Sequence, residues 1–467
     1  MIKQVIRVKT MLITSAFIEK IKNAYDIRSH KIEENDAYII GKSFGSYLKL
    51  QNKNKVIVGY DRRSKSLALH NSLAKGLIET GINVVSIGKS TTAMVEIAEF
   101  FYSADASISV TASHNGASYH GFKFFVDKKS FAGHDLAGSL EIAISGKFAS
   151  GKKKGNLSFQ TNFALDYSDI LKNSIKNKGK FKIGWDLCNA SAGDVFNHVL
   201  KFINGINIII NHEEKEDFGG FAPDPSINER LKTLKASIKK YNLDFAFAFD
   251  GDSDRCILID KKGNRVPGDK LLAMFSYFAI KKNKKNITTV WDSKSSQVLI
   301  KWLSTFGVKS IISPTGHSNI YNNLKKANAE IGGEFSGHYM FKDFFGVNDG
   351  IYSALRFVQH LEENNMQLEE AINLMPKVWV DPEKNIECSD IEKVKTLHNI
   401  EKVLKREGVT IQNNDGIKAC YSYGWWLVRA SKTEPILRIS AEGWTEEGLE
   451  RTKNHLSVVL ESIGIDY

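Results

Sequence analysis

Three carboxylates stand on alternate residues in the segment AFAFDGDSDR, at Asp250, Asp252 and Asp254. An apolar run leads directly into them, which indicates a buried strand that ends in an acidic loop. Three carboxylates this close repel one another unless a hard divalent cation neutralises them, and oxygen ligands suit Mg²⁺. An EF-hand is excluded, because its sixth and twelfth positions require Gly and Glu and are Arg255 and Lys261 here. We therefore predict a magnesium site at the end of this strand.

A second polar loop, TASHNGASYHGFK, carries Ser113 and His114 side by side. A β-prone run precedes the loop, and a strand resumes at Phe122, so the hydroxyl of Ser113 can protrude from a turn. Adjacent Ser and His residues do not form a catalytic pair, because the base must approach the hydroxyl from elsewhere in the fold. An ordinary polar turn is the alternative for such a pair. The residues alone leave open whether Ser113 is a nucleophile.

Two further loops carry groups that suit a phosphorylated sugar. The segment GGEFSGH presents Glu334, Ser336 and His338 on alternate positions, and such acceptors and donors suit vicinal hydroxyls. The segment RASKTEPILR gathers cationic and hydroxyl donors that suit a phosphate dianion, namely Arg429, Ser431, Lys432, Thr433 and Arg438. Ordinary polar and basic turns are the alternatives for these two loops.

One pattern occurs three times and predicts the elements that position these loops. The segments VIVGYD, FKIGWD and TTVWD are β-rich runs that end in an aromatic residue and an aspartate, at Asp61, Asp186 and Asp292. Each is followed by a segment of helical period that ends at a glycine, and then by another β-rich run; the glycines are Gly81, Gly205 and Gly307. Strand, helix and strand at this spacing predict a βαβ unit with two parallel strands.

The three repeats lie at domain-sized intervals along 467 residues. We therefore expect an α/β protein of three tandem related domains with mixed sheets, followed by a C-terminal α+β domain, all arranged around a central cleft. The expected domains are residues 1–160, 161–266, 267–379 and 380–467. The segment ASGKKKGNLS near Gly151 is interpreted as the first linker.

The composition limits the classes of partner. The chain has 42% hydrophobic and 25% charged residues and only 7 prolines, which is typical of a globular protein. Its net charge of +11 comes from lysines spread along the chain without interleaved aromatic residues, so we expect no nucleic-acid partner. A positive field also favours phosphorylated small molecules. No apolar run reaches the roughly 18 residues of a membrane helix, so we expect no membrane association.

The cysteines and the N-terminal segment favour a cytoplasmic protein. The four cysteines form no CxxC pair and are interpreted as reduced thiols. The N-terminal segment has scattered lysines, a short apolar run from Met11 to Ile18 and no cleavage pattern, so it is not a secretory signal. Residues 1–10 are a candidate superfluous leader before Met11.

Together and in this order, the four loops resemble those of the α-D-phosphohexomutase superfamily, most closely its bacterial phosphomannomutase/phosphoglucomutase group. The resemblance extends from AYDIR at Ala24 to the RASKTEPILR loop. It implies that Ser113 is a phosphoserine, and that Asp250, Asp252 and Asp254 hold Mg²⁺ together with an oxygen of that phosphate. It further implies that Ser113 gives its phosphate to a hexose monophosphate, that a hexose 1,6-bisphosphate forms and turns over, and that the other phosphate returns to Ser113. The implied activator is hexose 1,6-bisphosphate, and we expect a monomer or weak dimer.

The resemblance also assigns roles to other residues. Lys123 matches the lysine placed for proton transfer, and Arg28 and His338 match its partners near the reacting oxygen. A general base near neutral pH needs a lysine with a lowered pKa, which neighbouring cations and desolvation could provide. The implied ligand contacts are Tyr25, Arg255, Lys294, Thr315, Gly316, His317, Glu334, Ser336, Arg429, Ser431, Lys432, Thr433 and Arg438.

The chain departs from the family pattern at four positions. Gly116 and His120 stand where the serine loop usually has Pro and Asn, Ser29 replaces a Gly after YDIR, and Lys432 replaces a small or amide residue in the phosphate loop. None of these departures removes a catalytic group, so we expect activity.

The resemblance favours mannose phosphates, and glucose phosphates as well, because GEFSGH and AYDIR are similar to the loops of that group. Three alternatives stay open. A phosphoglucosamine mutase would differ in both loops. A metal-dependent sugar phosphatase would use Asp250 as its nucleophile, although that pattern has Thr or Val where Asp254 stands. A catalytically inactive phosphosugar-binding protein would follow if Gly116, His120 and Lys432 impaired the site.

Overall fold

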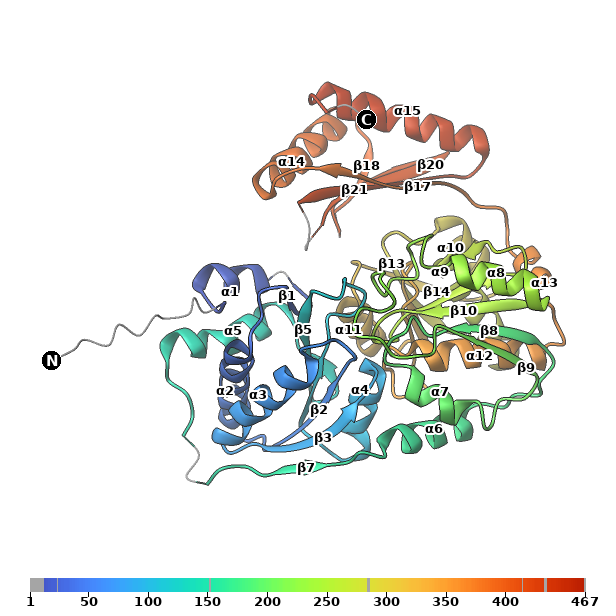
Figure 1. Ribbon diagram of the computed structural model, residues 1–467. Helices are drawn as coiled ribbons and strands as arrows, with labels where there is room; N and C mark the ends of the chain where they lie inside the picture. The colour runs from blue at the N-terminus through green and yellow to red at the C-terminus, as the bar shows by residue number, and fades with distance from the viewer. Residues whose placement is uncertain are drawn as a thin grey trace. The chain divides into compact units, whose positions relative to one another are not determined.

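The computed structural model describes residues 12–22, 24–150, 153–283, 286–413, 415–431 and 435–465. Figure 1 follows the chain from its N-terminus to its C-terminus. Unit 1 comprises Met1–Val266 and His338–Leu368, and unit 2 comprises Pro267–Gly337 and Glu369–Tyr467. The candidate leader, residues 1–10, lies outside the described residues, as do Lys432 and Thr433.

The first sheet of unit 1 has the order β1-β5-β4-β2-β3-β7, with β6 beside β5. β2 is parallel to β3 and β4, whereas β5 is antiparallel to β4 and β1, so the sheet is mixed. Its strands are β1 (Ile27–Ser29), β2 (Lys55–Tyr60), β3 (Asn83–Lys89), β4 (Ala106–Val110), β5 (His120–Val126), β6 (Lys129–Ser130) and β7 (Leu157–Phe159).

Helices cover this sheet, and Figure 1 shows α2 and α3 side by side. Buried side chains of α2 and α3 pack on the face of β2 that carries Val56 and Val58. α4 connects β3 back to β4 on the other side of β2, and the right-handed rule for such crossovers places it on the opposite face. The helices are α1 (Ser15–Ile21), α2 (Glu34–Leu50), α3 (Ser66–Glu79), α4 (Thr92–Phe101) and α5 (Gly133–Ser145).

The second sheet of unit 1 has the order β12-β11-β10-β8-β9. β8 is parallel to β9 and β10, and β11 is antiparallel to β10. Trp185 of β8 stacks on Phe247 and Phe249 of β10, which also contact Phe196 of α7 and Phe357 of α12. The strands are β8 (Lys182–Asp186), β9 (Ile206–Ile210), β10 (Phe245–Phe249), β11 (Cys256–Asp260) and β12 (Arg265–Val266). The helices are α6 (Phe163–Ser174), α7 (Gly193–Val199), α8 (Lys232–Tyr241) and α12 (Gly350–Glu363), and the short strand β16 (Tyr339–Phe341) precedes α12.

The third repeat lies in unit 2. Here β13 is parallel to both β14 and β15. Its elements are α9 (Gly268–Asn283), β13 (Thr288–Asp292), α10 (Gln297–Ser304), β14 (Lys309–Ser313), α11 (His317–Ala327) and β15 (Ile331–Gly333). In all three repeats the first strand lies between the second and the third, and helices make both connections. The strands β2, β8 and β13 carry the VIVGYD, FKIGWD and TTVWD segments, so the three tandem βαβ units predicted from the sequence are confirmed.

The C-terminal part of unit 2 is an antiparallel sheet of order β17-β21-β20-β19-β18. Apolar residues of α14 and α15 pack against it, and Figure 1 shows both helices on one face. The predicted α+β class is therefore confirmed, whereas the domain limits and the central cleft stay predictions. The elements are α13 (Leu368–Asn373), β17 (Trp379–Glu387), α14 (Asp390–Arg406), β18 (Thr410–Gln412), β19 (Ile417–Tyr421), β20 (Gly424–Ala430), β21 (Ile436–Gly443) and α15 (Glu446–Ser462).

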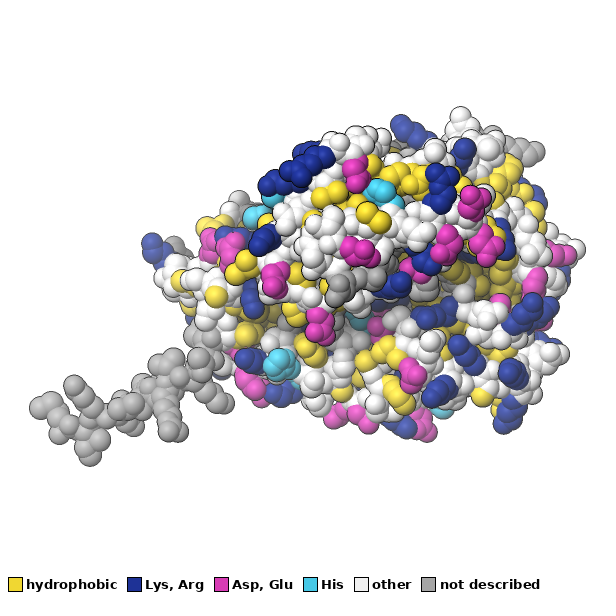
Figure 2. Space-filling model, turned by 90° about the horizontal axis from the view of Figure 1, so that it is seen from above, with side chains coloured by type: hydrophobic (Ala, Val, Ile, Leu, Met, Phe, Trp, Pro, Cys, Tyr) yellow, Lys and Arg dark blue, Asp and Glu magenta, His cyan; other side chains and the backbone are white. Residues whose placement is uncertain are grey.

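Other features match the composition. Within the described residues, no helix is long and apolar enough to cross a membrane. All four cysteines are free thiols, as expected, at Cys188, Cys256, Cys388 and Cys420. Figure 2 shows Lys and Arg side chains interspersed with Asp and Glu on one face of the molecule.

Buried polar groups join the antiparallel sheet to the third repeat within unit 2. Glu442 of β21 accepts hydrogen bonds from Ser296 Oγ (2.5 Å) and from the backbone N of Gln297 (3.0 Å), which caps α10. Lys418 of β19 donates to the carbonyl of Ser293 (3.0 Å) and lies over the ring of Trp425. Burial lowers the pKa of Lys418 to about 8, although Cys420, Glu442 and Asp292 oppose this shift.

The buried ammonium of Lys418 gives unit 2 a pH-dependent stability. Its pKa is lowered in the folded state, so the unfolded chain binds the proton more tightly and stability rises as pH increases from about 8 toward 10.5. Between pH 7 and 9.5 we expect the free energy of unfolding to rise by about 2 kcal/mol more in the wild type than in Lys418→Met. Urea unfolding at the two pH values measures this difference, and Lys402→Met, an exposed position on α14, is the control. Parallel pH dependence in wild type and Lys418→Met would contradict the prediction.

Candidate active site

Three of the four loops singled out in the sequence occupy equivalent places in the three repeats. Each begins where the third strand ends: the Ser113 loop after β4, the aspartate loop after β10 and the GEFSGH loop after β15. Because the first and third strands of each repeat are parallel, each loop leaves its sheet at the carboxyl edge, where α/β proteins place their ligand sites.

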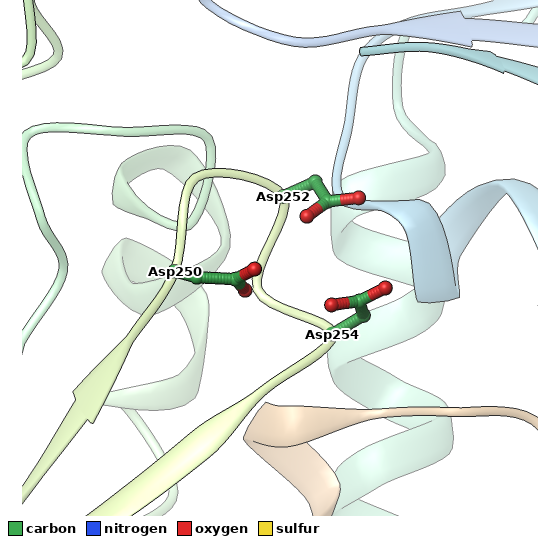
Figure 3. Close-up of side chains that lie close together, drawn as sticks. All are labelled: Asp250, Asp252 and Asp254. Carbon is green, nitrogen blue, oxygen red and sulfur yellow. The ribbon is translucent and has the colours of Figure 1, made fainter. Parts of the chain in front are cut away.

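The aspartate loop places three carboxylates together, as predicted. Figure 3 shows Asp250, Asp252 and Asp254 on the loop between two strands, with their side chains directed toward a common space. One oxygen from each lies within 4.8 Å of the others, and all three residues are buried. Burial, reinforced by the charges of Asp254 and Asp252, raises the pKa of Asp250 well above its usual value. The cluster therefore needs a positive charge.

The carboxylate oxygens fit a divalent cation. Asp252 Oδ1 is buried and has no hydrogen-bond partner among the described residues, although its other oxygen accepts from Lys123 and from Thr92 Oγ1. An ionised oxygen without a donor is costly inside a protein, and a hard cation is the partner that carboxylates favour. A metal ion held by this cluster would satisfy that oxygen.

Lys123 of β5 supplies positive charge in the structure. Its Nζ lies 2.6 Å from Asp252 Oδ2 and 2.6 Å from Asp254 Oδ2, in buried ion pairs. Burial alone would lower the pKa of Lys123, but these two carboxylates raise it above its ordinary value. The expectation of a lowered pKa for Lys123 is therefore wrong for this state, because the sequence did not reveal that two anions contact the amine.

Ser113 lies against the aspartate cluster. Its Oγ is 3.1 Å from Asp250 Oδ2 and 3.3 Å from the Nδ1 of His114, and the residue is buried. Burial, and then the nearby Arg255 and Arg28, lower the pKa of His114 well below its usual value, so this imidazole is neutral. The carboxylate that contacts the Ser113 hydroxyl therefore comes from a distant loop. Gly251 permits this approach, since a Cβ there would lie 2.5 Å from the Ser113 carbonyl oxygen.

Two arginines surround the same loop. Arg28 on β1 forms a two-pronged ion pair with Asp26 and donates to Asn115 Oδ1 (2.9 Å) beside the serine. Burial alone would lower the pKa of Arg28, but the carboxylate of Asp26 raises it above its ordinary value. Arg255 donates from Nε to His338 Nε2 (3.0 Å), and His338 Nδ1 lies 3.6 Å from Asp254 Oδ1.

Unit 1 thus contains all four catalytic residues inferred from the sequence. It brings together Ser113, Lys123, Arg28, His338, Arg255, Asp250, Asp252 and Asp254. Tyr25 is partly buried just before β1.

Unit 2 brings two of the predicted ligand loops together. The buried carboxylate of Glu334 accepts a hydrogen bond from the backbone N of Gly316 (2.6 Å), which precedes α11 and His317. Thr315 donates its backbone N to Asp415 Oδ2 (3.0 Å). Ser336 is partly buried two residues beyond Glu334. A hydrogen bond therefore joins the GEFSGH segment to the TGHS segment.

Two cations predicted to bind phosphate, Arg429 and Arg438, and the predicted ligand contact Lys294 gather around one carboxylate in unit 2. Glu383 of β17 lies 3.4 Å from Lys294 Nζ, 3.7 Å from an Arg429 nitrogen and 3.0 Å from an Arg438 nitrogen. Burial would raise the pKa of Glu383, but these cations hold it below its usual value. Ser431, two residues after Arg429, is buried, and its backbone carbonyl accepts a hydrogen bond from Lys393 Nζ.

The sequence interpretation missed Glu383 and Arg63. Glu383 stands in VDPEKN, where no motif distinguishes it. Arg63 follows Asp61, the end of the first repeat segment, and its guanidinium donates to the carbonyl of Ser113 (2.7 Å). The aspartate that ends each repeat segment was a signal in the sequence. Nothing in the sequence indicated Arg63, which stands two residues after Asp61.

Comparisons with known proteins agree with this arrangement. Four family models described as phosphoglucomutase/phosphomannomutase match the chain: alpha/beta/alpha domain I at residues 19–153, domain II at 165–263, domain III at 267–378 and the C-terminal domain at 383–457.

Curated relatives span almost the whole chain. A phosphomannomutase/phosphoglucomutase of Pseudomonas syringae pv. tomato is 31% identical over 452 residues, which are 96% of this chain and 96% of its own. A phosphoglucomutase of Neisseria meningitidis is 30% identical and covers 95% of this chain and 97% of its own. A probable phosphoglucosamine mutase of Methanocella arvoryzae is 30% identical over 87% of this chain and 90% of its own.

A solved structure shares the fold. The crystal structure of a phosphoglucomutase/phosphomannomutase family protein from Burkholderia thailandensis superposes with a TM-score of 0.87 at 26% identity, over 95% of this chain and 97% of that chain.

Proposed function

Since the chain belongs to the phosphoglucomutase/phosphomannomutase family and is a phosphohexomutase, an isomerase, we propose that it interconverts mannose 6-phosphate and mannose 1-phosphate, and glucose phosphates as well. The proposed route passes through a phosphoserine at Ser113 and a hexose 1,6-bisphosphate, which also serves as activator. The observation that carries it is the buried Ser113 hydroxyl 3.1 Å from a carboxylate of the three-aspartate cluster.

The side chains of unit 1 suit phosphoryl transfer. Ser113 Oγ carries the phosphoryl group, and Asp250 together with the Asn115–Arg28 contact fixes the loop that presents it. We propose that Asp250, Asp252 and Asp254 hold Mg²⁺ with a phosphate oxygen on Ser113; the ion when bound neutralises charge on the transferring group. Arg28, Arg255 and His338 would add hydrogen-bond donors around the oxygens of the transferring phosphoryl group.

Lys123 is the proposed proton-transfer group. In the structure its amine is held as an ammonium by Asp252 and Asp254. To accept a proton from a sugar hydroxyl it must leave these carboxylates, because they are what raises its pKa.

The remaining ligand contacts are proposed for unit 2. Glu334 and Ser336 would bind sugar hydroxyls, and Thr315, Gly316 and His317 extend that surface. The cationic and hydroxyl side chains of the RASKTEPILR loop would bind the second phosphate, and Lys294 would lie beside them. These side chains are Arg429, Ser431, Lys432, Thr433 and Arg438. Tyr25 and Arg255, which belong to unit 1, complete the proposed contacts.

Phosphorus NMR tests the activity. Purified protein is mixed with Mg²⁺, mannose 1-phosphate and a trace of hexose 1,6-bisphosphate. We expect the 6-phosphate resonance to appear without free phosphate. Release of inorganic phosphate would instead indicate the phosphatase, and an unchanged spectrum with every hexose phosphate would indicate a binding protein.

A phosphoglucosamine mutase is the second candidate, because the relative described as a probable phosphoglucosamine mutase matches 87% of this chain. Competing mannose, glucose and glucosamine 1-phosphates in one sample discriminate the two. Faster turnover of the amino sugar would overturn the mannose and glucose assignment while leaving the mutase class intact.

The phosphate-binding role of Arg438 predicts a change in KM. An arginine–phosphate hydrogen bond contributes about 1.5–3 kcal/mol, so we expect Arg438→Ala to raise the KM for the sugar phosphate about 10- to 100-fold. A contact made equally in ground and transition states changes KM with little change in kcat. Steady-state kinetics measure both constants, and Arg451→Ala, exposed on α15, is the control. An unchanged KM would remove Arg438 from the site.

Further properties of the chain follow only from sequence and family likeness. We propose a cytoplasmic enzyme that is a monomer or weak dimer, with domains at residues 1–160, 161–266, 267–379 and 380–467. The limits after residues 160 and 266 fall between strands, whereas the limit after residue 379 falls one residue inside β17.

A further inference from the structure

Arg63 uses its entire guanidinium group on the loop that carries Ser113. Its Nε donates to Asp61 Oδ2 (3.0 Å). Its two terminal nitrogens donate to four backbone carbonyls of the loop: those of Ser113 (2.7 Å), Asn115 (2.7 Å), Gly116 (2.6 Å) and Tyr119 (3.0 Å). An arginine has five N–H donors, so every one of them has an acceptor here. The residue is 3% exposed.

The position of Arg63 is itself fixed. Asp61 accepts from the Arg63 side chain, from Ser66 Oγ (2.5 Å) and from Thr111 Oγ1 (2.7 Å). The ring of Phe218 lies against the guanidinium, 4.9 Å from its central carbon. Because the guanidinium of Arg63 is hydrogen-bonded to Asp61 and to the serine loop, it cannot turn toward another partner without losing several hydrogen bonds.

The serine loop needs such support. Ser113 has a φ of 51°, in the left-handed region that a residue with a side chain rarely adopts. Gly116 stands in the middle of the loop, where no proline ring fixes the backbone and an added Cβ would meet nothing within 4 Å. Carbonyls that converge on one cation are held in place by charge-assisted hydrogen bonds instead.

The same hydrogen bonds decide what the other side of the loop presents. With their carbonyl oxygens on Arg63, Ser113 directs its Oγ to Asp250 and Asn115 directs its side-chain oxygen to Arg28. Thr111 connects Asp61 to the serine loop, since its Oγ1 donates to Asp61 and accepts from the backbone N of Ser113 (2.9 Å).

We infer that Arg63 is a positioning residue for phosphoryl transfer: it fixes the backbone of residues 113–119 so that Ser113 Oγ faces the aspartate cluster, and it binds no substrate because all its donors are occupied. The inference rests on the proposed phosphoserine role of Ser113.

Arg63→Lys is the decisive variant, because it keeps the charge and removes the planar fork. A misplacement of about 1 Å can lower a rate about 10²-fold, so we expect kcat to fall by about that factor while KM for mannose 1-phosphate changes less than about threefold. A lysine has only three donors and cannot reproduce five contacts. Arg62→Lys is the matched control, since Arg62 is the adjacent cation, is partly exposed and pairs with Glu214 instead.

Amide hydrogen exchange separates this inference from the proposed function. In substrate-free protein we expect Arg63→Lys to speed exchange in residues 111–119 at least about tenfold, with strands β2 and β4 unchanged. If the wild type converts no hexose phosphate but the loop still loosens in Arg63→Lys, the proposed function fails and the support of the loop stands. Wild-type kcat together with unchanged exchange in Arg63→Lys would overturn the inference.

Thr111→Val keeps the inference testable if Arg63→Lys does not fold. This nearly isosteric change breaks the link between Asp61 and the Ser113 backbone but leaves the arginine. We expect kcat to fall about tenfold and exchange in residues 113–119 to rise. A Thr111→Val enzyme equal to the wild type in both would count against a loop held through Asp61 and Arg63.

Discussion

Replacement of Ser113 by alanine is expected to lower mutase turnover by more than about 10³-fold, because the hydroxyl proposed to carry the phosphoryl group is lost while binding groups remain. The backbone of residue 113 keeps its hydrogen bonds to Thr111 Oγ1 and Arg63, so the loop and the aspartate cluster should persist. Phosphorus NMR with mannose 1-phosphate, Mg²⁺ and hexose 1,6-bisphosphate measures the loss. Intact-mass spectrometry measures the covalent phosphate, which we expect on the wild type and not on Ser113→Ala.

Ser145→Ala controls for the loss of a serine hydroxyl, since Ser145 is exposed at the end of α5. It should retain both turnover and phosphate. Substantial turnover by Ser113→Ala would exclude a phosphoserine at this position and direct attention to Asp250 as the nucleophile of a phosphatase.

Replacement of Asp252 by asparagine is the second change with a large expected effect. Among the described residues, one oxygen of Asp252 has no hydrogen-bond partner and the other contacts Lys123, so the substitution removes a proposed metal ligand and an ion pair together. We expect turnover to fall by about 10³-fold or more, as for loss of a group that neutralises charge in phosphoryl transfer.

Metal binding gives a readout independent of turnover. A ligand at 100 times its Kd stabilises the folded state by about 2.7 kcal/mol. We therefore expect saturating Mg²⁺ to raise the Tm of the wild type and to change that of Asp252→Asn by much less. Asp127→Asn, a surface carboxylate paired with Lys53, is the control. An equal rise in Tm for wild type and Asp252→Asn would place the metal elsewhere.

Local sequence predicted the fold and the catalytic loops well, and the reason is that both rest on short-range patterns. Apolar runs ending at Asp61, Asp186 and Asp292, each followed by a helix and a glycine, are sufficient to predict three βαβ units. Three aspartates on alternate residues after a buried strand must share one small volume whatever the rest of the chain does, so their cluster was predictable as well.

The electrostatic state of the site depended on contacts between distant segments. Lys123 and Asp252 are 129 residues apart in sequence, yet they form a 2.6 Å ion pair, which reverses the expected direction of the lysine pKa. The sequence shows which ionisable side chains are present, whereas the pKa of each depends on its burial and on which charges lie within a few ångströms.

The sequence alone determined that this protein has tandem α/β repeats with a serine loop, an acidic loop and two further polar loops, because strand period, helix ends and residue type are local properties. Only the tertiary structure decided which groups share a charge: Lys123 between two aspartates, Glu383 among three cations, and Arg63 beneath the backbone of Ser113. The physical reason is that ion pairs and hydrogen bonds act over a few ångströms, and chain segments far apart in sequence reach that range only after the sheets and helices have packed.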